Sequence, residues 1–324
     1  MKRQAEVVAG AVFLLATLGA LAPLSLNSQS PRPVGPADAL RPRVRVDIDL
    51  VLVNVTVTDP YNRLVTGLSK EHFEVEEDKA RQQILYFSNE DVPLSLGVVF
   101  DLSGSMNRAS KLERAAKAAV TFLQTANPED EFFVVHFSDE PRLLTGFTHH
   151  VEDVQNSLVT IQAKGRTALL DALYLALDTM REASNPRKAL LVISDGGDNH
   201  SRYSVRDVMS AVREADVQIY AIGIFDPVGA RSEPEILWGP SLLKDIAETT
   251  GGRMFPVALH NLAQLPDVAE KISIELRNQY ILGYLPSNKE RDGTWRKIKV
   301  KLSPPKGLPP LTTYARHGYY APTQ

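Results

Sequence analysis

Five oxygen-bearing side chains stand where apolar segments of the sequence end or begin. They are Asp101, Ser103, Ser105, Thr167 and Asp195. A hard cation such as Mg²⁺ prefers carboxylate and hydroxyl oxygens and binds six of them in octahedral geometry at about 2.0 to 2.1 Å. Because Mn²⁺ fits the same oxygen ligands, the residue types predict a divalent cation and leave Mg²⁺ and Mn²⁺ as alternatives.

The first three of these residues form a DxSxS motif directly after the apolar run 94–100. Such a motif occurs by chance in roughly one chain in ten of this length, and an Asp and two Ser also suit the cap of a following helix. Its position favours a ligand site, because open α/β sheets bind ligands outside the carboxyl ends of their strands. Asp195 follows the apolar run 189–194 in the same way.

Alternating strand-like and helix-like segments must position these side chains. Between Pro93 and residue 277, apolar runs typical of buried strands alternate with segments that carry apolar residues at helical spacing. Strands are expected at 94–100, 132–137, 189–194, 218–225 and 253–257, and helices at 111–126, 168–181, 204–215, 241–249 and 263–277. Repeated strand-helix units predict a largely parallel sheet wrapped by helices.

Strand-like patterns flank this α/β region on both sides. Valines alternate with other residues over 51–57, and apolar residues alternate with lysines over 297–302, with further strands expected at 280–285 and 311–317. Each flank has too few short strands to bury two faces and cover its edges. We therefore expect one small antiparallel, sandwich-like β domain built from residues 44–92 and 278–321, with residues 93–277 inserted as the α/β domain.

The residues of the three loops, in their order and spacing, are similar to those of the von Willebrand factor type A (VWA) domain. Its metal-ion-dependent adhesion site (MIDAS) combines a DxSxS loop, a threonine loop and an aspartate loop. The resemblance covers residues 93 to about 276 and fills all five positions. It implies a Rossmann-like VWA fold in which Ser103, Ser105 and Thr167 offer hydroxyl oxygens, while Asp101 and Asp195 bind directly or through water. A carboxylate of another molecule would then complete the metal's shell.

The N-terminus carries an export pattern. Lys2 and Arg3 precede an apolar run over 7–22, as in a secretory signal peptide. Pro23 follows the small-residue cleavage pattern and hinders a peptidase, and residues 7–26 would span about 30 Å as a helix, so an uncleaved anchor is the alternative. Residues 1–26 are thus expected to be a signal peptide or anchor and 27–43 a Pro-rich linker.

This pattern predicts that the protein lies outside the cytoplasm, either secreted or periplasmic. A second, more local resemblance points the same way. The segment from Thr66-Gly67-Leu68 through Phe73 to Asp78, ahead of the α/β region, resembles the VWFA-related family of exported bacterial proteins. We expect contact with a membrane only through the N-terminal anchor.

Composition excludes several function classes. The formal net charge is −3, so the chain lacks the basic field that attracts nucleic acid. The absence of cysteine excludes disulfides, thiolate metal sites and cysteine nucleophiles. The sequence has no HExxH pair, GxSxG turn or Walker loop, so we expect no enzyme.

The leading functional hypothesis is an adhesion-type module that captures an acidic side chain of a protein ligand at the bound cation. One alternative is an envelope scaffold in which the metal only pins three loops, and another is a metal-dependent hydrolase. His200 is a candidate base for the hydrolase, although a solvated loop histidine is commoner. His149 and His150 lack a third ligand for zinc.

Overall fold

The computed structural model describes residues 50–108, 110–159, 161–225 and 234–323. These residues form a six-stranded sheet in the order β10-β9-β8-β5-β6-β7 and two four-stranded antiparallel sheets in the orders β13-β1-β11-β4 and β14-β12-β2-β3. The prediction of a mixed α/β fold with a helix-flanked, largely parallel sheet and additional antiparallel β structure is confirmed.

The six-stranded sheet has five parallel strands and one antiparallel edge strand. Its strands are β5 (Leu94–Asp101), β6 (Glu131–Phe137), β7 (Pro141–Thr148), β8 (Arg187–Ser194), β9 (Gln218–Phe225) and β10 (Met254–Ala258). All residues of β5 are buried, which explains its uninterrupted apolar run. The sequence pattern missed β7, because this edge strand is half-exposed throughout and has no regular apolar alternation.

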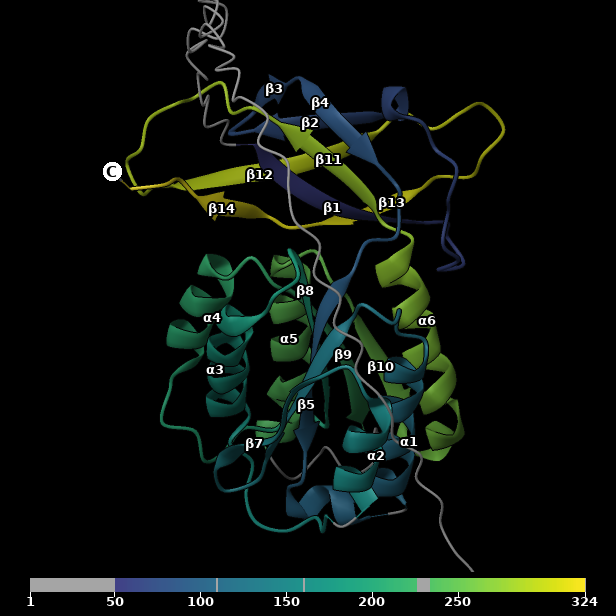
Figure 1. Cartoon of the computed structure of the whole chain (residues 1–324), viewed down its shortest axis with the longest axis vertical. Helices are drawn as coiled ribbons and strands as arrows, with labels where there is room; N and C mark the ends of the chain where they lie inside the picture. Colours follow the sequence, from purple (N-terminus) through teal and green to yellow (C-terminus); the bar gives the residue numbers. More distant parts are fainter. Residues whose placement is uncertain (1–49, 109, 160, 226–233, 324) are drawn as a thin grey trace, which may run out of the picture. The chain divides into compact units, whose positions relative to one another are not determined.

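Helices cover both faces of this sheet (Figure 1). Buried residues of α1, α2 and α6 belong to the core on one face, and those of α3, α4 and α5 to the core on the other. The α-helices are α1 (Lys111–Gln124), α2 (Val151–Val159), α3 (Leu169–Thr179), α4 (Val205–Glu214), α5 (Pro234–Thr249) and α6 (Leu265–Arg277). Short 3₁₀ segments are η1 (Lys70–His72), η2 (Gly104–Asn107), η3 (Met180–Glu182) and η5 (Leu259–Gln264). Helix α2 was not predicted, although Val151, Val154 and Leu158 of its sequence VEDVQNSLV stand at helical spacing.

The two antiparallel sheets enclose a third core of buried side chains. Their strands are β1 (Val51–Thr58), β2 (Phe73–Glu77), β3 (Ala80–Gln82), β4 (Ile84–Ser88), β11 (Tyr280–Tyr284), β12 (Trp295–Leu302), β13 (Thr312–Ala315) and β14 (Gly318–Tyr320). Val51, Val53 and Val55 lie in the same core as Ile298 and Val300. The segment expected as one strand at 311–317 instead serves both sheets, since β13 pairs with β1 and β14 with β12.

Strands from before and after the α/β region pair with each other in both antiparallel sheets. β1 lies between β11 and β13, and β12 pairs with β2. The boundaries 44–92 with 278–321 and 93–277 stay a prediction. The expected signal or anchor (1–26) and the linker (27–43) lie outside the described residues. No helix within the described residues is long and apolar enough to cross a membrane.

Candidate metal centre

Two neighbouring parallel strands bring the first aspartate and the aspartate loop to one edge of the sheet. β5 pairs with β8 in a register that places Phe100 opposite Ile193, so Asp101 stands level with Ser194. The Ser194 hydroxyl donates a hydrogen bond of 2.6 Å to Oδ2 of Asp101. Asp195 follows directly and is 8% exposed, while Asp101 is fully buried. Sequence reasoning missed Ser194, because only the strand register shows that it stands level with Asp101.

The DxSxS loop turns back on its own aspartate. The Ser103 amide donates to Oδ1 of Asp101 at 2.8 Å, and the hydroxyl oxygens of Ser103 and Ser105 lie 2.9 Å apart. The 3₁₀ turn η2 produces this arrangement, because it folds Ser105 back toward Ser103 instead of letting the strand continue. Three of the five predicted ligands are therefore in one hydrogen-bonded group.

Backbone hydrogen bonds hold the threonine loop between the other two loops. The Gly104 amide donates to the Gly165 carbonyl at 3.0 Å. On its other side, the Thr167 amide donates to Oδ1 of Asn199 at 3.0 Å, and the Asn199 amide donates to the Thr167 carbonyl at 3.0 Å. No described residue hydrogen-bonds with the Thr167 hydroxyl, which leaves that oxygen free to accept a cation.

Burial and a neighbouring negative charge perturb the Asp101 carboxyl group. Burial, followed by the negative charge of Asp195, raises the pKa of Asp101 to about 6. The Lys111 ammonium lies 3.4 Å from Oδ2 of Asp195, and only 5% of the Lys111 residue is exposed. Lys111 is a second residue that sequence reasoning missed, because it was noticed only as the start of a helix. Two acidic groups thus share a buried site with one basic group, which attracts a further positive charge.

The donor set fits a hard divalent cation. It consists of two carboxylates and three hydroxyls, which are ligands for Mg²⁺ or Mn²⁺ rather than for soft metals. No group of three or more His, Cys, Asp or Glu side chains that could hold a metal occurs among the described residues. The structure links Asp101, Ser103, Ser105 and Asp195 by direct bonds or charge, and it connects Thr167 to them through the backbone.

The histidines have other contacts. A guanidinium nitrogen of Arg166 lies 3.3 Å from Nδ1 of His200. Nδ1 of His149 lies 2.7 Å from the Asp130 carbonyl oxygen, so it is engaged as a donor there. His150 is exposed.

A helix-flanked, mostly parallel sheet with oxygen-bearing loops at its carboxyl edge defines a class of α/β ligand-binding domains. Residues 96–197 match the family model of the von Willebrand factor type A domain. The chain carries a VWA domain, a class that typically mediates protein interactions and adhesion.

Curated relatives match over a limited stretch. Inter-alpha-trypsin inhibitor heavy chain H4 of Bos taurus is 24% identical over 225 residues, which are 64% of this chain and 23% of that protein. The human H4 chain is 25% identical over 235 residues, 66% of this chain and 24% of that protein. The chain therefore spans about a quarter of the length of these relatives.

Two solved structures also resemble this chain. The von Willebrand factor domain of the type V pili tip protein Mfa5 from Porphyromonas gingivalis covers 57% of this chain and 97% of its own, with 15% identity and a TM-score of 0.46. A von Willebrand factor type A protein from Catenulispora acidiphila covers 83% of this chain and 74% of its own, with 14% identity and a TM-score of 0.49.

Proposed function

We propose that the chain is an exported, adhesion-type binding module with a MIDAS. Asp101, Ser103, Ser105, Thr167 and Asp195 hold Mg²⁺ or Mn²⁺, and an acidic side chain of a protein ligand completes the metal's shell. The observation that carries the proposal is the pair of buried carboxylates at the ends of β5 and β8, close enough for Asp195 to raise the pKa of Asp101. A bound cation would relieve that repulsion.

The neutral ligands explain why the site would capture an anion. Hydroxyl oxygens of Ser103, Ser105 and Thr167 carry no charge, so a cation that they hold keeps its attraction for a carboxylate from another molecule. We propose binding rather than catalysis, because Nδ1 of His200, the candidate base, is already in contact with a guanidinium nitrogen of Arg166 at 3.3 Å. A position outside the cytoplasm is proposed from Lys2, Arg3 and the apolar residues 7–22.

Calorimetry with Mg²⁺ and Mn²⁺ tests the metal site. We expect Asp101→Asn to weaken binding at least about tenfold, because one buried carboxylate is worth more than about 1.4 kcal/mol of cation attraction. Asp178→Asn is the matched control, since Asp178 is an exposed aspartate at the far end of α3. Equal metal affinity in the wild type and Asp101→Asn would overturn the site.

Capture of a ligand tests the adhesion role. Immobilised chain is incubated with an envelope extract in Mg²⁺ or in chelator, and bound proteins are identified. We expect capture that needs Mg²⁺ and is lost in Thr167→Ala. If the chain binds metal in calorimetry but captures its ligand equally in Mg²⁺ and in chelator, the scaffold in which the metal only pins loops is favoured.

A further inference from the structure

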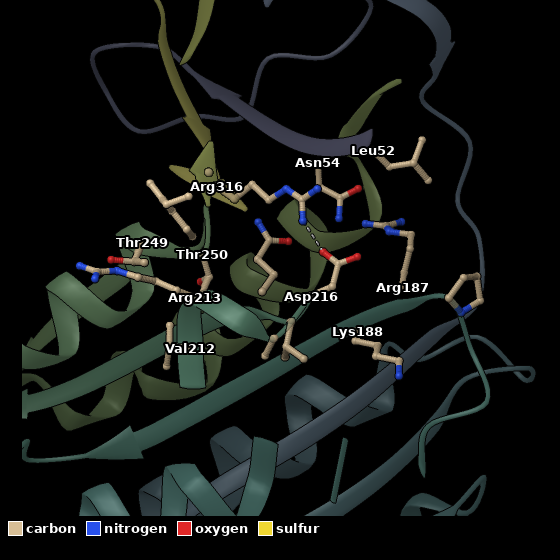
Figure 2. Close-up of a pocket in the computed structure, with 16 residues that line it drawn as sticks. Leu52, Asn54, Arg187, Lys188, Val212, Arg213, Asp216, Thr249, Thr250 and Arg316 are labelled. Atoms are coloured by element: carbon tan, nitrogen blue, oxygen red, sulfur yellow. Dashed lines mark hydrogen bonds and ion pairs between the residues drawn. The ribbon is translucent and has the colours of Figure 1, made fainter. Parts of the chain in front are cut away.

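A cavity lies at the amino-terminal edge of the six-stranded sheet, where the starts of β8 and β9 meet β1, β12 and β14 (Figure 2). Its volume is about 50 Å³. One water needs roughly 10 to 15 Å³ by this measure, so the cavity has room for about four water-sized groups. It is separate from the candidate metal centre, because Arg187 begins β8 and Asp195 follows the opposite end of that strand.

Arg187 carries an incompletely paired charge into this cavity. Its side chain is buried, with only 7% of the residue exposed. Nη2 donates to the Leu276 carbonyl at 2.6 Å and to Oε1 of Gln279 at 2.8 Å. Nε and Nη1 are buried and have no hydrogen-bond partner among the described residues. Burial lowers the pKa of Arg187, as expected for a charge that its surroundings compensate poorly.

The cavity as a whole is electropositive. Four of its lining residues are basic and one is acidic, namely Arg187, Lys188, Arg213, Arg316 and Asp216. Asp216 is already neutralised, because its Oδ1 accepts from Arg316 Nη1 at 2.7 Å, and Nε of Arg316 is itself buried without a partner. The Lys188 ammonium donates to the Met180 carbonyl at 3.0 Å and the Arg213 guanidinium lies over the Trp295 ring, so Arg187 and Arg316 supply the positive charge that the cavity offers a ligand.

We propose that this cavity binds a small inorganic oxyanion, phosphate or sulfate, against the guanidinium groups of Arg187 and Arg316. A tetrahedral oxyanion has four oxygens, which match the space, and planar guanidinium groups pair with such oxygens through two N–H donors at once. Water would fit the same space and accept hydrogen bonds from the arginines, but it would bring no negative charge. The bound anion would tie β8 to the strands of the β sandwich, and this role is independent of the metal-dependent function.

Thermal unfolding and calorimetry of the full chain test the proposal. Sodium phosphate and sodium sulfate are titrated separately, with chloride used to keep the ionic strength constant and chelator present throughout. We expect a saturable rise in the unfolding midpoint with at least one oxyanion, since a ligand that binds only the folded state stabilises it. The salt that raises the unfolding midpoint, phosphate or sulfate, identifies the bound anion. Shifts no larger than those with chloride would overturn the proposal.

Variants locate the site. Arg187→Gln is expected to weaken oxyanion binding at least tenfold, whereas Arg206→Gln, an exposed arginine of α4 outside the cavity, keeps wild-type affinity. Asn54→Asp serves if Arg187→Gln does not fold, because it places a negative charge on the cavity wall at constant size and should abolish binding. Thr167→Ala should bind the oxyanion as the wild type does. Unchanged affinity in Arg187→Gln or Asn54→Asp would refute the site.

Discussion

Lys111 gives the candidate metal centre a positive charge of its own. It is the first residue of α1, and its ammonium lies 3.4 Å from Asp195 while only 5% of the residue is exposed. A lysine is rarely this buried without a partner. Its charge offsets part of the repulsion between Asp101 and Asp195 when no cation is present, and it opposes the approach of a divalent cation. Lys111 should therefore set both the stability of the metal-free protein and its metal affinity.

Lys111→Met tests this balance. In chelator, we expect the free energy of unfolding to fall by about 3 kcal/mol, because a buried carboxylate loses its partner. In saturating Mg²⁺ the loss should be smaller, since the cation replaces the ammonium. Urea unfolding in both conditions measures the difference, and Lys117→Met, at an exposed position of α1, is the control. An equal loss of unfolding free energy with and without Mg²⁺ would contradict the idea that the cation can replace the Lys111 ammonium.

His136 of β6 links stability to pH. Its Nδ1 is buried without a partner among the described residues, and burial, helped by the Arg142 charge, lowers the pKa of His136 below its usual 6.5. The unfolded chain therefore binds more protons below pH 6.5, so this residue makes stability fall as the pH drops from 6.5 through the folded-state pKa.

In His136→Gln that contribution should be absent. We expect the variant to lose less stability than the wild type between pH 7 and pH 5, measured by urea unfolding at each pH. The exposed His150→Gln serves as control and should follow the wild type. A wild-type slope in His136→Gln would show that the histidine is protonated equally in both states.

At the scale of elements, the threonine loop depends on one glycine. Gly165 has a φ of +85°, a backbone conformation that L side chains rarely adopt. A Cβ there would lie 2.6 Å from Oδ2 of Asp139, which accepts from the Arg166 amide through its other oxygen. The position of Thr167 beside the DxSxS loop therefore rests on a residue without a side chain.

Gly165→Ala should lower the free energy of unfolding by about 1 to 3 kcal/mol, because it imposes backbone strain and a close contact. Metal affinity should fall as well, since Thr167 shifts with its loop. Gly146→Ala is the control, because its Cβ would meet nothing within 4 Å and its φ is not positive. Urea unfolding measures the change in stability of both variants, and metal titration measures the change in their metal affinity. A neutral Gly165→Ala would mean that the loop adapts without strain.

At the scale of the whole described chain, two segments far apart in sequence complete each other's sheets. β12 pairs with β2 and β13 with β1, and side chains from both segments share one core. Hydrogen bonds also tie this β structure to the α/β part, since the Arg253 guanidinium donates to Oδ1 of Asn62 at 2.9 Å and the Lys271 ammonium to the Asn62 carbonyl at 2.6 Å. Neither β segment has a complete sheet alone.

Deletion of residues 286–324 should therefore disturb the N-terminal strands. It removes β12, β13 and β14, so that β2 loses one of its two neighbours, β1 loses β13, and the buried valines of β1 lose the β12 side chains of the facing sheet. We expect amide hydrogens of β1 and β2 to exchange at least tenfold faster, while those of β5 and β8 stay protected. Equal protection of residues 50–90 in the full and shortened chains would show that the N-terminal β segment is an independent unit.

The sequence by itself determined the parallel core and the candidate ligands. Strands such as β5 and β8 are buried on both faces, so they appear as apolar runs whatever their neighbours are. The order of the DxSxS, threonine and aspartate segments likewise follows from the chain alone. The metal role of the five residues remains a prediction that the chelator and calorimetry experiments address.

Only the tertiary structure decided which polar groups meet. β7 lacks a clear apolar period because it is an edge strand whose residues are all partly or fully exposed, and pairing with β6 decides its structure. Lys111, Ser194 and Arg187 have no motif to distinguish them from surface residues. Their significance arises from burial beside partners remote in sequence, and the energy of a charged or polar group depends on that surrounding medium and not on its neighbours along the chain.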